Sequence, residues 1–222
     1  MSGRGALALS WSGGKDSALA LSALADEGIV PTTLLATVTE EYGRVSMHGV
    51  RRSLLRRQAA ATGLPLVEID IPAGCTNELY ESRMAAAFGS ELATVDEVAF
   101  GDLFLEDIRD YRERRLARAG RRARFPVWGR DTAMLARRFL AAGFRAILVC
   151  VDPRVLDPSF AGRDYDERLL ADLPAGVDPC GENGEFHTFV TDGPVLEHPV
   201  DCRRGEVVER DGFVFCDLLD AA

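Results

Sequence analysis

The sequence predicts an α/β fold, in which a parallel sheet carries helices on both faces and a smaller C-terminal α+β domain follows. Short apolar or β-branched runs alternate with helical patterns through the first half of the chain. A glycine-rich turn directly follows the first of these runs. The composition breaks around residues 126–129, and residues 152–193 are rich in Asp, Pro and Gly. Repeated β-α-β units of this spacing require a parallel sheet with right-handed crossovers.

The elements of the first half are predicted from their local patterns. The strands are short runs of apolar and β-branched residues, and the helices are rich in Ala and Leu or carry apolar residues at helical spacing. In chain order we expect a strand at 6–10, a helix at 15–27, a strand at 32–39, a helix at 50–62, a strand at 65–71, a helix at 77–88, a strand at 95–100 and a helix at 106–119. The first domain is predicted to comprise residues 1–128.

The second domain is predicted to comprise residues 129–222. It begins with a helix at 132–142 that leads into a buried strand at 146–151. The following Asp-, Pro- and Gly-rich stretch is expected to be an ordered loop, and loops of this length in compact proteins are usually functional. The remaining elements are a loop at 152–193 with one short helix at 165–173, and a closing hairpin with strands at 206–210 and 213–218 around an Asp-Gly turn.

Composition narrows the class of protein. The 222 residues are 47% hydrophobic and 27% charged, which is typical of a globular protein, and no apolar run is long enough to span a membrane. Without a signal-peptide core near the start, we expect a cytoplasmic protein. The net charge of −9 argues against a nucleic-acid partner, and the arginines at 112–124 alternate with acidic residues as on a solvated helix face. A homodimer is left open.

The cysteines and the single lysine carry further information. The five cysteines are scattered and never spaced as Cys-x-x-Cys, which argues against a disulfide framework and a structural zinc site. Of the 26 basic residues, 25 are arginine and one is lysine, Lys15. A compact ammonium and a planar guanidinium are not interchangeable against a phosphate in a tight loop. The position of Lys15 within the glycine-rich turn therefore favours a phosphate-binding role.

The turn itself reads Ser10-Trp11-Ser12-Gly13-Gly14-Lys15-Asp16-Ser17, between the first strand and the first helix. Its glycines let the backbone approach a ligand, and N–H groups at a helix start face an anion. The serine hydroxyls add donors, and Asp16 is our candidate ligand for Mg²⁺. An ordinary glycine turn before a helix is the alternative. The residues that we expect to bind ATP here are Ser10, Ser12, Gly13, Gly14, Lys15, Asp16 and Ser17.

This motif resembles the signature of the PP-loop ATP pyrophosphatases. In that superfamily the loop holds the pyrophosphate leaving group while an oxygen nucleophile attacks the α-phosphorus of ATP. The resemblance implies a first domain that binds ATP and a reaction that forms AMP and pyrophosphate. Lys15 would then be catalytic, since it and the loop amides stabilise the charge that develops on the leaving group, and Asp16 would act through Mg²⁺ that bridges the phosphates.

A second polar cluster, Cys180-Gly181-Glu182-Asn183-Gly184-Glu185-Phe186-His187-Thr188, resembles the Gly-Glu-Gly-Gly-Glu-Phe/Tyr-Glu-Thr motif of the diphthine–ammonia ligase family. The similarity extends to Gly101-Asp102 and to the segment from Trp128 to Thr132. Known members amidate the carboxylate of diphthine on an elongation factor, with ATP and ammonia. The resemblance implies a Rossmann-like first domain and a smaller second domain, residues 129–222, that recognises the substrate. It implies catalytic roles for Glu182, Glu185 and His187. It also implies substrate contacts from Asp102, Glu182, Asn183, Glu185, His187 and Thr188.

Two departures bear on the acceptor. The diphthine-amidating members carry Glu where this chain has His187, and Gly where it has Asn183. Diphthine bears a trimethylammonium group, which carboxylates and aromatic faces favour, and the change from Glu to His removes a negative charge. We therefore expect an ATP-dependent carboxylate–ammonia ligase whose acceptor could be another carboxylate.

Other interpretations stay open. His48 follows the second strand at the edge where α/β sheets bind ligands, and it could contact ATP or simply belong to a helix start. A PP-loop RNA-modifying enzyme is a second functional hypothesis, for which a basic surface or paired cysteines would be expected. A non-catalytic nucleotide-binding module of the universal-stress type is a third.

Overall fold

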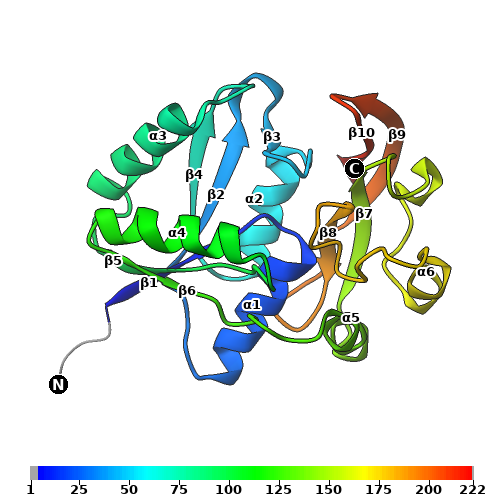
Figure 1. The fold of residues 1–222 in the computed structure, drawn as a ribbon, viewed down its shortest axis with the longest axis horizontal. Coiled ribbons are helices and arrows are strands. Elements are labelled where there is room, and N and C mark those ends of the chain that lie inside the picture. The colour runs from blue at the N-terminus through cyan, green and yellow to red at the C-terminus, as the bar shows by residue number, and fades with distance from the viewer. Residues whose placement is uncertain (1–4, 222) are drawn as a thin grey trace.

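The computed structural model describes residues 5–221 and contains two sheets (Figure 1). The first sheet has a parallel core in the order β4-β2-β1-β5-β6. The short strand β3 pairs antiparallel with the last residues of β2. The strands are β1 (Ala6–Ser10), β2 (Thr33–Thr39), β3 (Arg44–Val45), β4 (Leu66–Ile71), β5 (Val95–Ala99) and β6 (Arg122–Arg124), and the 3-10 helix η1 (Glu40–Tyr42) links β2 to β3.

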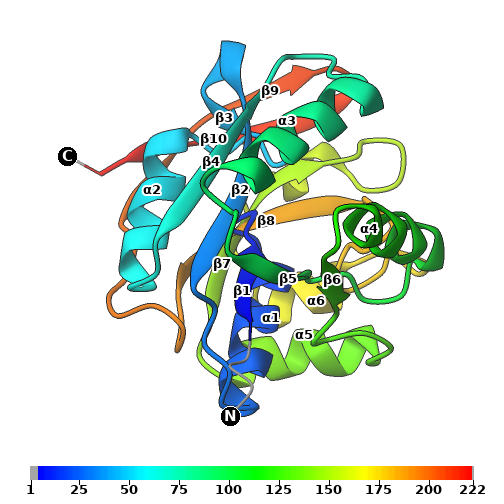
Figure 2. The ribbon, with the colours of Figure 1, turned by 90° about the vertical axis from the view of Figure 1, so that its left-hand side faces the viewer.

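Helices cover both faces of this sheet, as Figures 1 and 2 show. Alternate residues of β1 enter opposite cores, because successive side chains of a strand point to opposite faces. Leu7 and Leu9 belong to the core that contains α1 and α2, whereas Ala8 belongs to the core that contains α3 and α4. The helices are α1 (Lys15–Asp26), α2 (Arg52–Ala61), α3 (Asn77–Gly89) and α4 (Glu106–Arg118).

The second sheet is antiparallel, in the order β8-β7-β10-β9. Its strands are β7 (Arg145–Val151), β8 (Phe186–Asp192), β9 (Cys202–Arg210) and β10 (Phe213–Asp220). The helical elements of this half are α5 (Thr132–Ala141), η2 (Pro158–Phe160) and α6 (Glu167–Asp172). The fold class predicted from the sequence is therefore confirmed.

The two sheets meet at the start of α1, where β8 runs beside the glycine-rich turn (Figure 1). The Val190 N–H donates to the Gly13 carbonyl at 2.9 Å, and the Lys15 N–H donates to the Thr188 hydroxyl at 3.0 Å. One hydrophobic core contains Leu24 and Leu54 of the first half together with Phe189 of the second. The boundary at 128/129 stays a prediction.

Most predicted elements are confirmed to within about two residues, but the interpretation of 152–193 as loop around one helix is wrong at its end. Residues Phe186–Asp192 form β8, which pairs with β7 across the second sheet. The Gly- and Asp-rich residues before β8 concealed its short run of strand-forming residues. The hairpin also starts earlier than predicted, at Cys202, and β3 and β6 were missed because each has three residues or fewer.

No helix within residues 5–221 combines the length and the apolar character that a membrane-spanning segment requires.

Candidate functional site

The glycine-rich turn brings the backbone close to its neighbours. Gly13 has a φ of +79°, a conformation that residues with a Cβ seldom adopt. A Cβ on Gly13 would lie 2.6 Å from Gln58 Oε1, and one on Gly14 would lie 3.0 Å from the Thr188 carbonyl oxygen. Gly14 is the N-cap of α1 and supplies no side-chain cap to the helix N–H groups. The turn therefore presents the amino end of α1 to a ligand.

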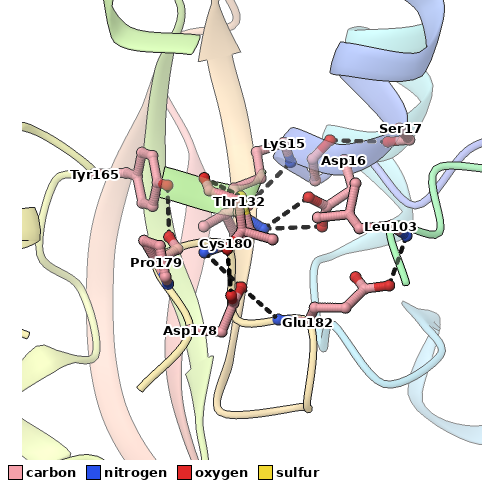
Figure 3. Close-up of polar contacts among 12 residues, drawn as sticks. Lys15, Asp16, Ser17, Leu103, Thr132, Tyr165, Asp178, Pro179, Cys180 and Glu182 are labelled. Atoms are coloured by element: carbon pink, nitrogen blue, oxygen red, sulfur yellow. Dashed lines mark hydrogen bonds and ion pairs between the residues drawn. The ribbon is translucent and has the colours of Figure 1, made fainter. Parts of the chain in front are cut away.

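Lys15 lies at the centre of the junction between the sheets and is only 2% exposed. Its Nζ donates to both carboxylate oxygens of Asp16 at 2.9 Å (Figure 3). The same nitrogen lies 5.5 Å from the centre of the Phe186 ring. Burial is the largest influence and lowers the pKa of Lys15, but the Asp16 carboxylate and other neighbours outweigh it, so the pKa is raised. The ammonium therefore stays charged at neutral pH.

The serine hydroxyls of the turn lie beside Lys15. Ser12 Oγ accepts from the Gly14 N–H at 3.3 Å, and Ser17 Oγ donates to the Gly14 carbonyl at 2.8 Å. The two hydroxyl oxygens are 3.5 Å apart. Ser10 ends β1 and pairs in register with Leu35 of β2.

Two histidines from different halves of the chain meet beside the turn. The rings of His48 and His187 have centroids 4.5 Å apart, and His48 Nδ1 is 3.4 Å from the Thr188 carbonyl oxygen. Burial, followed by the charge of Lys15, lowers the pKa of His187 to about 4. Burial, followed by His187, lowers the pKa of His48 well below its usual value. Both imidazoles are therefore neutral at pH 7.

The segment before β8 folds over the start of α1 (Figure 3). Glu182 Oε1 accepts the Leu103 N–H at 2.7 Å, so a carboxylate of the second half binds the loop that follows β5. Burial is the main cause that raises the pKa of Glu182 to about 7. Glu182 therefore lies on the junction and titrates near neutral pH.

Glu185 and Asn183 lie within this segment and hold its conformation. Glu185 is 5% exposed, and its Oε1 accepts from the Asp178 N–H at 3.0 Å and from Asn183 Nδ2 at 2.9 Å. Its Oε2 has no hydrogen-bond partner among residues 5–221. The structure thus shows Glu185 and Asn183 bonded to their own segment.

Asp178 is a residue of the site that the sequence reasoning missed. Its Oδ2 accepts the Thr132 hydroxyl at 2.6 Å, and its Oδ1 accepts the N–H groups of Cys180 and Glu182 at 2.8 and 3.3 Å (Figure 3). An Asp that bonds the backbone two residues ahead is a common turn signal, so the Asp178-Pro179 pair could have suggested it. Asp178 fixes the segment that carries Glu182.

Asp102 lies in the loop that follows β5 and is paired with the guanidinium of Arg112. Its Oδ2 is 2.7 Å from Arg112 Nε, and its Oδ1 accepts from Arg112 Nη2 at 3.1 Å. In this structure Asp102 is therefore occupied by an ion pair.

A cavity of about 540 Å³ opens beside His187, at the carboxyl ends of β2 and β4. Ligands of open α/β sheets bind at this edge. Aromatic, aliphatic and polar side chains from both halves of the chain line it, including Thr37, Thr39, Tyr42, Ser46, Met47, Ile71, Tyr80, His187, Phe213 and Phe215. Its size suits a nucleotide-sized ligand.

Within residues 5–221, no group of three or more His, Cys, Asp or Glu side chains is arranged to hold a metal ion. Both oxygens of Asp16, the predicted Mg²⁺ ligand, are bonded to Lys15. Asp102 is paired with Arg112, and Asn183 and Glu185 are bonded within their own segment. The other predicted site residues gather at the junction of the two sheets.

Comparison with known families accounts for both halves of the chain. Residues 5–123 match the diphthamide synthase N-terminal domain, and residues 131–218 match the diphthamide synthase C-terminal domain. The chain belongs to the diphthamide synthase family. The two glycine-containing motifs of the site fall one in each of these matched domains.

Similar curated proteins are named diphthine–ammonia ligase. Those of Bos taurus and Homo sapiens are 30% identical over 97 residues, which cover 41% of this chain and 36% of each relative. The protein of Schizosaccharomyces pombe is 29% identical over 96 residues, or 41% of this chain and 16% of its own length. The match thus spans about a third or less of these relatives.

A solved structure, described as a predicted subunit of tRNA methyltransferase from Methanocaldococcus jannaschii, is 16% identical with a TM-score of 0.43 and covers 89% of this chain and 100% of its own.

Proposed function

We propose that this chain is an ATP-dependent carboxylate–ammonia ligase that forms AMP and pyrophosphate. The observation that carries the proposal is the buried Lys15 at the amino end of α1, enclosed by β8 and the segment before it. Family membership supports ligase chemistry of this kind, because the similar curated proteins are named diphthine–ammonia ligase.

The residues of the turn fit a triphosphate. The N-cap residue Gly14 has no side chain to cap the start of α1, and this helix end offers a partial positive charge to an anion. Lys15 adds a full charge that burial shields from water, and electrostatic interactions are stronger in such a site. On ATP binding, Lys15 would exchange Asp16 for a phosphate oxygen. Asp16 could then bind Mg²⁺ together with phosphate oxygens, since Mg²⁺ is usually held by one or two carboxylates plus phosphates.

The adenosine of ATP would occupy the cavity of about 540 Å³ beside the turn. His187 belongs to both the site and the lining of this cavity, and the apolar and aromatic side chains of the cavity suit a purine ring. This placement sets the α-phosphate between the cavity and Lys15, where an acceptor carboxylate can reach it.

The reaction would proceed in two displacements. A carboxylate oxygen of the acceptor attacks the α-phosphorus, the bond to the bridging oxygen breaks, and pyrophosphate leaves as an acyl adenylate forms. Lys15 and the loop N–H groups stabilise the charge on the leaving pyrophosphate. Ammonia then attacks the acyl carbon, AMP leaves, and an amide remains. The attacking ammonia loses a proton, and neutral His187 and ionised Glu182 are the bases beside the turn.

The acceptor is proposed to be a carboxylate without a quaternary ammonium group. The diphthine-amidating members carry a Glu at the position of His187. In this chain that position holds a neutral imidazole, which lies against the second neutral imidazole of His48. Neutral imidazoles offer no negative charge to a trimethylammonium group, although aromatic side chains of the cavity remain available to one. Diphthine therefore serves as the reference acceptor in the test.

The test measures AMP and pyrophosphate release from ATP, with and without ammonium, across a panel of carboxylates that includes diphthine on its elongation factor. Release should require both a carboxylate and ammonium. Lys15→Ala should lower the rate by about 100-fold or more, since one preorganised charge or donor on a developing anion has this effect. Lys15→Arg is the matched control, because it retains the charge but not the compact ammonium.

Other outcomes would contradict the proposal and select an alternative. Formation of ADP would exclude cleavage between the α- and β-phosphates. Release of pyrophosphate only with RNA would favour an RNA-modifying enzyme. Tight ATP binding without turnover on every acceptor would favour a nucleotide-binding module.

A further inference from the structure

Gln58 is a polar side chain on α2 with no exposed surface, and its carboxamide is fully engaged. Nε2 donates to the Gly13 carbonyl at 3.0 Å and to the Val190 carbonyl at 2.6 Å. Oε1 accepts from Trp11 Nε1 at 2.9 Å. All three partners belong to the glycine-rich turn or to β8, so one amide joins three chain segments.

Burial alone does not explain a glutamine at this position. Its helix neighbours Leu54 and Leu55 are equally buried and apolar, and an apolar residue of similar volume would fill the space. A buried carboxamide costs free energy unless its hydrogen bonds are made, and here each of its N–H groups has a carbonyl partner. Gln58 therefore gives directional hydrogen bonds to the Gly13 and Val190 carbonyls and to the Trp11 indole N–H, and an apolar side chain could form none of these bonds.

The bonds to Gly13 determine the orientation of the turn. Its carbonyl accepts from Gln58 Nε2 and also from the Val190 N–H at 2.9 Å. Because a trans peptide is planar, fixing the Gly13 carbonyl also fixes the direction of the Gly14 N–H, which points the opposite way. That N–H donates to Ser12 Oγ at 3.3 Å in this structure, and a phosphate oxygen bound at the loop would replace Ser12 as its acceptor.

We propose that Gln58 is a positioning residue for the phosphate loop. It orients the Gly13–Gly14 peptide toward the phosphates and ties this peptide to β8, so that the second sheet and the loop keep one geometry. The inference rests on the proposed binding of ATP at this loop. The carboxamide of Gln58 would thus set the affinity for ATP without contacting ATP itself.

The experiment compares Mg·ATP dissociation constants of the wild type, Gln58→Met and Leu92→Ala. Methionine has a similar volume but makes none of the three bonds. Leu92 is buried in the core on the opposite face of the first sheet, so Leu92→Ala lowers stability without touching the turn. We expect ATP binding to weaken about 10-fold or more in Gln58→Met, because small misplacements in a site have large effects. Leu92→Ala should remain within about twofold of the wild type.

A second measurement needs no variant. If the Gln58 bonds favour ATP binding, ATP must favour the Gln58 bonds by the same factor, because coupling is reciprocal. Exchange of the Gln58 Nε2 protons with solvent should therefore slow when Mg·ATP is added. The chain has two tryptophans, so the indole N–H signal of Trp11 is readily resolved by NMR, and in Gln58→Met it should shift as its acceptor is lost.

The outcomes separate this inference from the proposed function. Equal ATP affinity in Gln58→Met and Leu92→Ala, or Nε2 exchange that ATP leaves unchanged, would overturn the positioning role and leave ATP binding intact. A wild type that binds no ATP would overturn the proposed function and this inference together. Selective weakening in Gln58→Met with slowed exchange in the wild type would support it.

Discussion

Glu182 brings a carboxylate into the junction between the two sheets. Its pKa is raised to about 7, mainly by burial and also by the Asp16 carboxylate, while the hydrogen bond from the Leu103 N–H and the charge of Lys15 oppose the shift. The folded state therefore binds a proton on Glu182 more tightly than the unfolded chain does. Stability from this group is fully present below the unfolded pKa and is lost as pH rises through the folded value.

Glu182→Gln should remove this pH dependence, because glutamine keeps an oxygen to accept the Leu103 N–H and has no charge to bury. We expect the variant to be more stable than the wild type at about pH 8 and similar to it at about pH 4, where Glu182 is protonated in both states. Thermal unfolding midpoints across this pH range measure the difference. A constant difference at every pH would mean that Glu182 titrates normally.

Strand β8 has two functions as an element. It pairs with β7 in the second sheet, and its Thr188 hydroxyl accepts the Lys15 N–H at the start of α1. The N-terminal N–H groups of a helix need partners from outside the helix, and Gly14 has no side chain to provide one. A strand of the second half thus stabilises the first helix of the chain.

Thr188→Val should test this contact, since valine has the shape of threonine without the acceptor. We expect a loss of about 1–3 kcal/mol in the free energy of unfolding, because a buried N–H is left without a partner. Thr191→Val is the matched control on the same strand, since the Thr191 hydroxyl makes only a long, exposed bond of 3.4 Å to the Arg145 carbonyl. Urea denaturation compares both variants, and equal losses would contradict the role of Thr188.

At the scale of the whole molecule, the two halves share a hydrophobic core. Buried residues of α1 and α2 belong to the same cluster as those of α5, β7 and β8. Hydrogen bonds that join Gly13 and Lys15 to β8 cross the same junction. Separating the halves would therefore expose apolar surface and buried polar groups at once, which opposes independent unfolding.

We expect residues of both halves to unfold in one cooperative transition. Tryptophan fluorescence, which reports on Trp11 and Trp128, should give the same denaturation midpoint as far-ultraviolet circular dichroism, which reports on both sheets. Two separated transitions would instead indicate that the predicted domains at 1–128 and 129–222 unfold independently.

Sequence patterns predict those parts of the fold and the site that depend on residues close together in the chain. The turn from Ser10 to Ser17 and the helix after it could be predicted, because glycine placement and helical spacing lie within a few residues of each other. The contact between Lys15 and Thr188 could not, because it joins positions 173 residues apart. Gln58 gave no signal, since a single glutamine on a helix matches no motif and its role depends on partners from two other segments.

The single lysine has a consequence for chemical labelling. Among the side chains of this sequence, the only amine is the Nζ of Lys15, and it is 2% exposed. An acyl-phosphate analogue of ATP, which transfers its acyl group to a nearby amine, would thus have one side chain to modify. Acylation also blocks tryptic cleavage at Lys15, so the modified residue would appear in a peptide that runs from Gly5 to Arg44. Occupancy of the phosphate loop could therefore be read from one peptide by mass spectrometry.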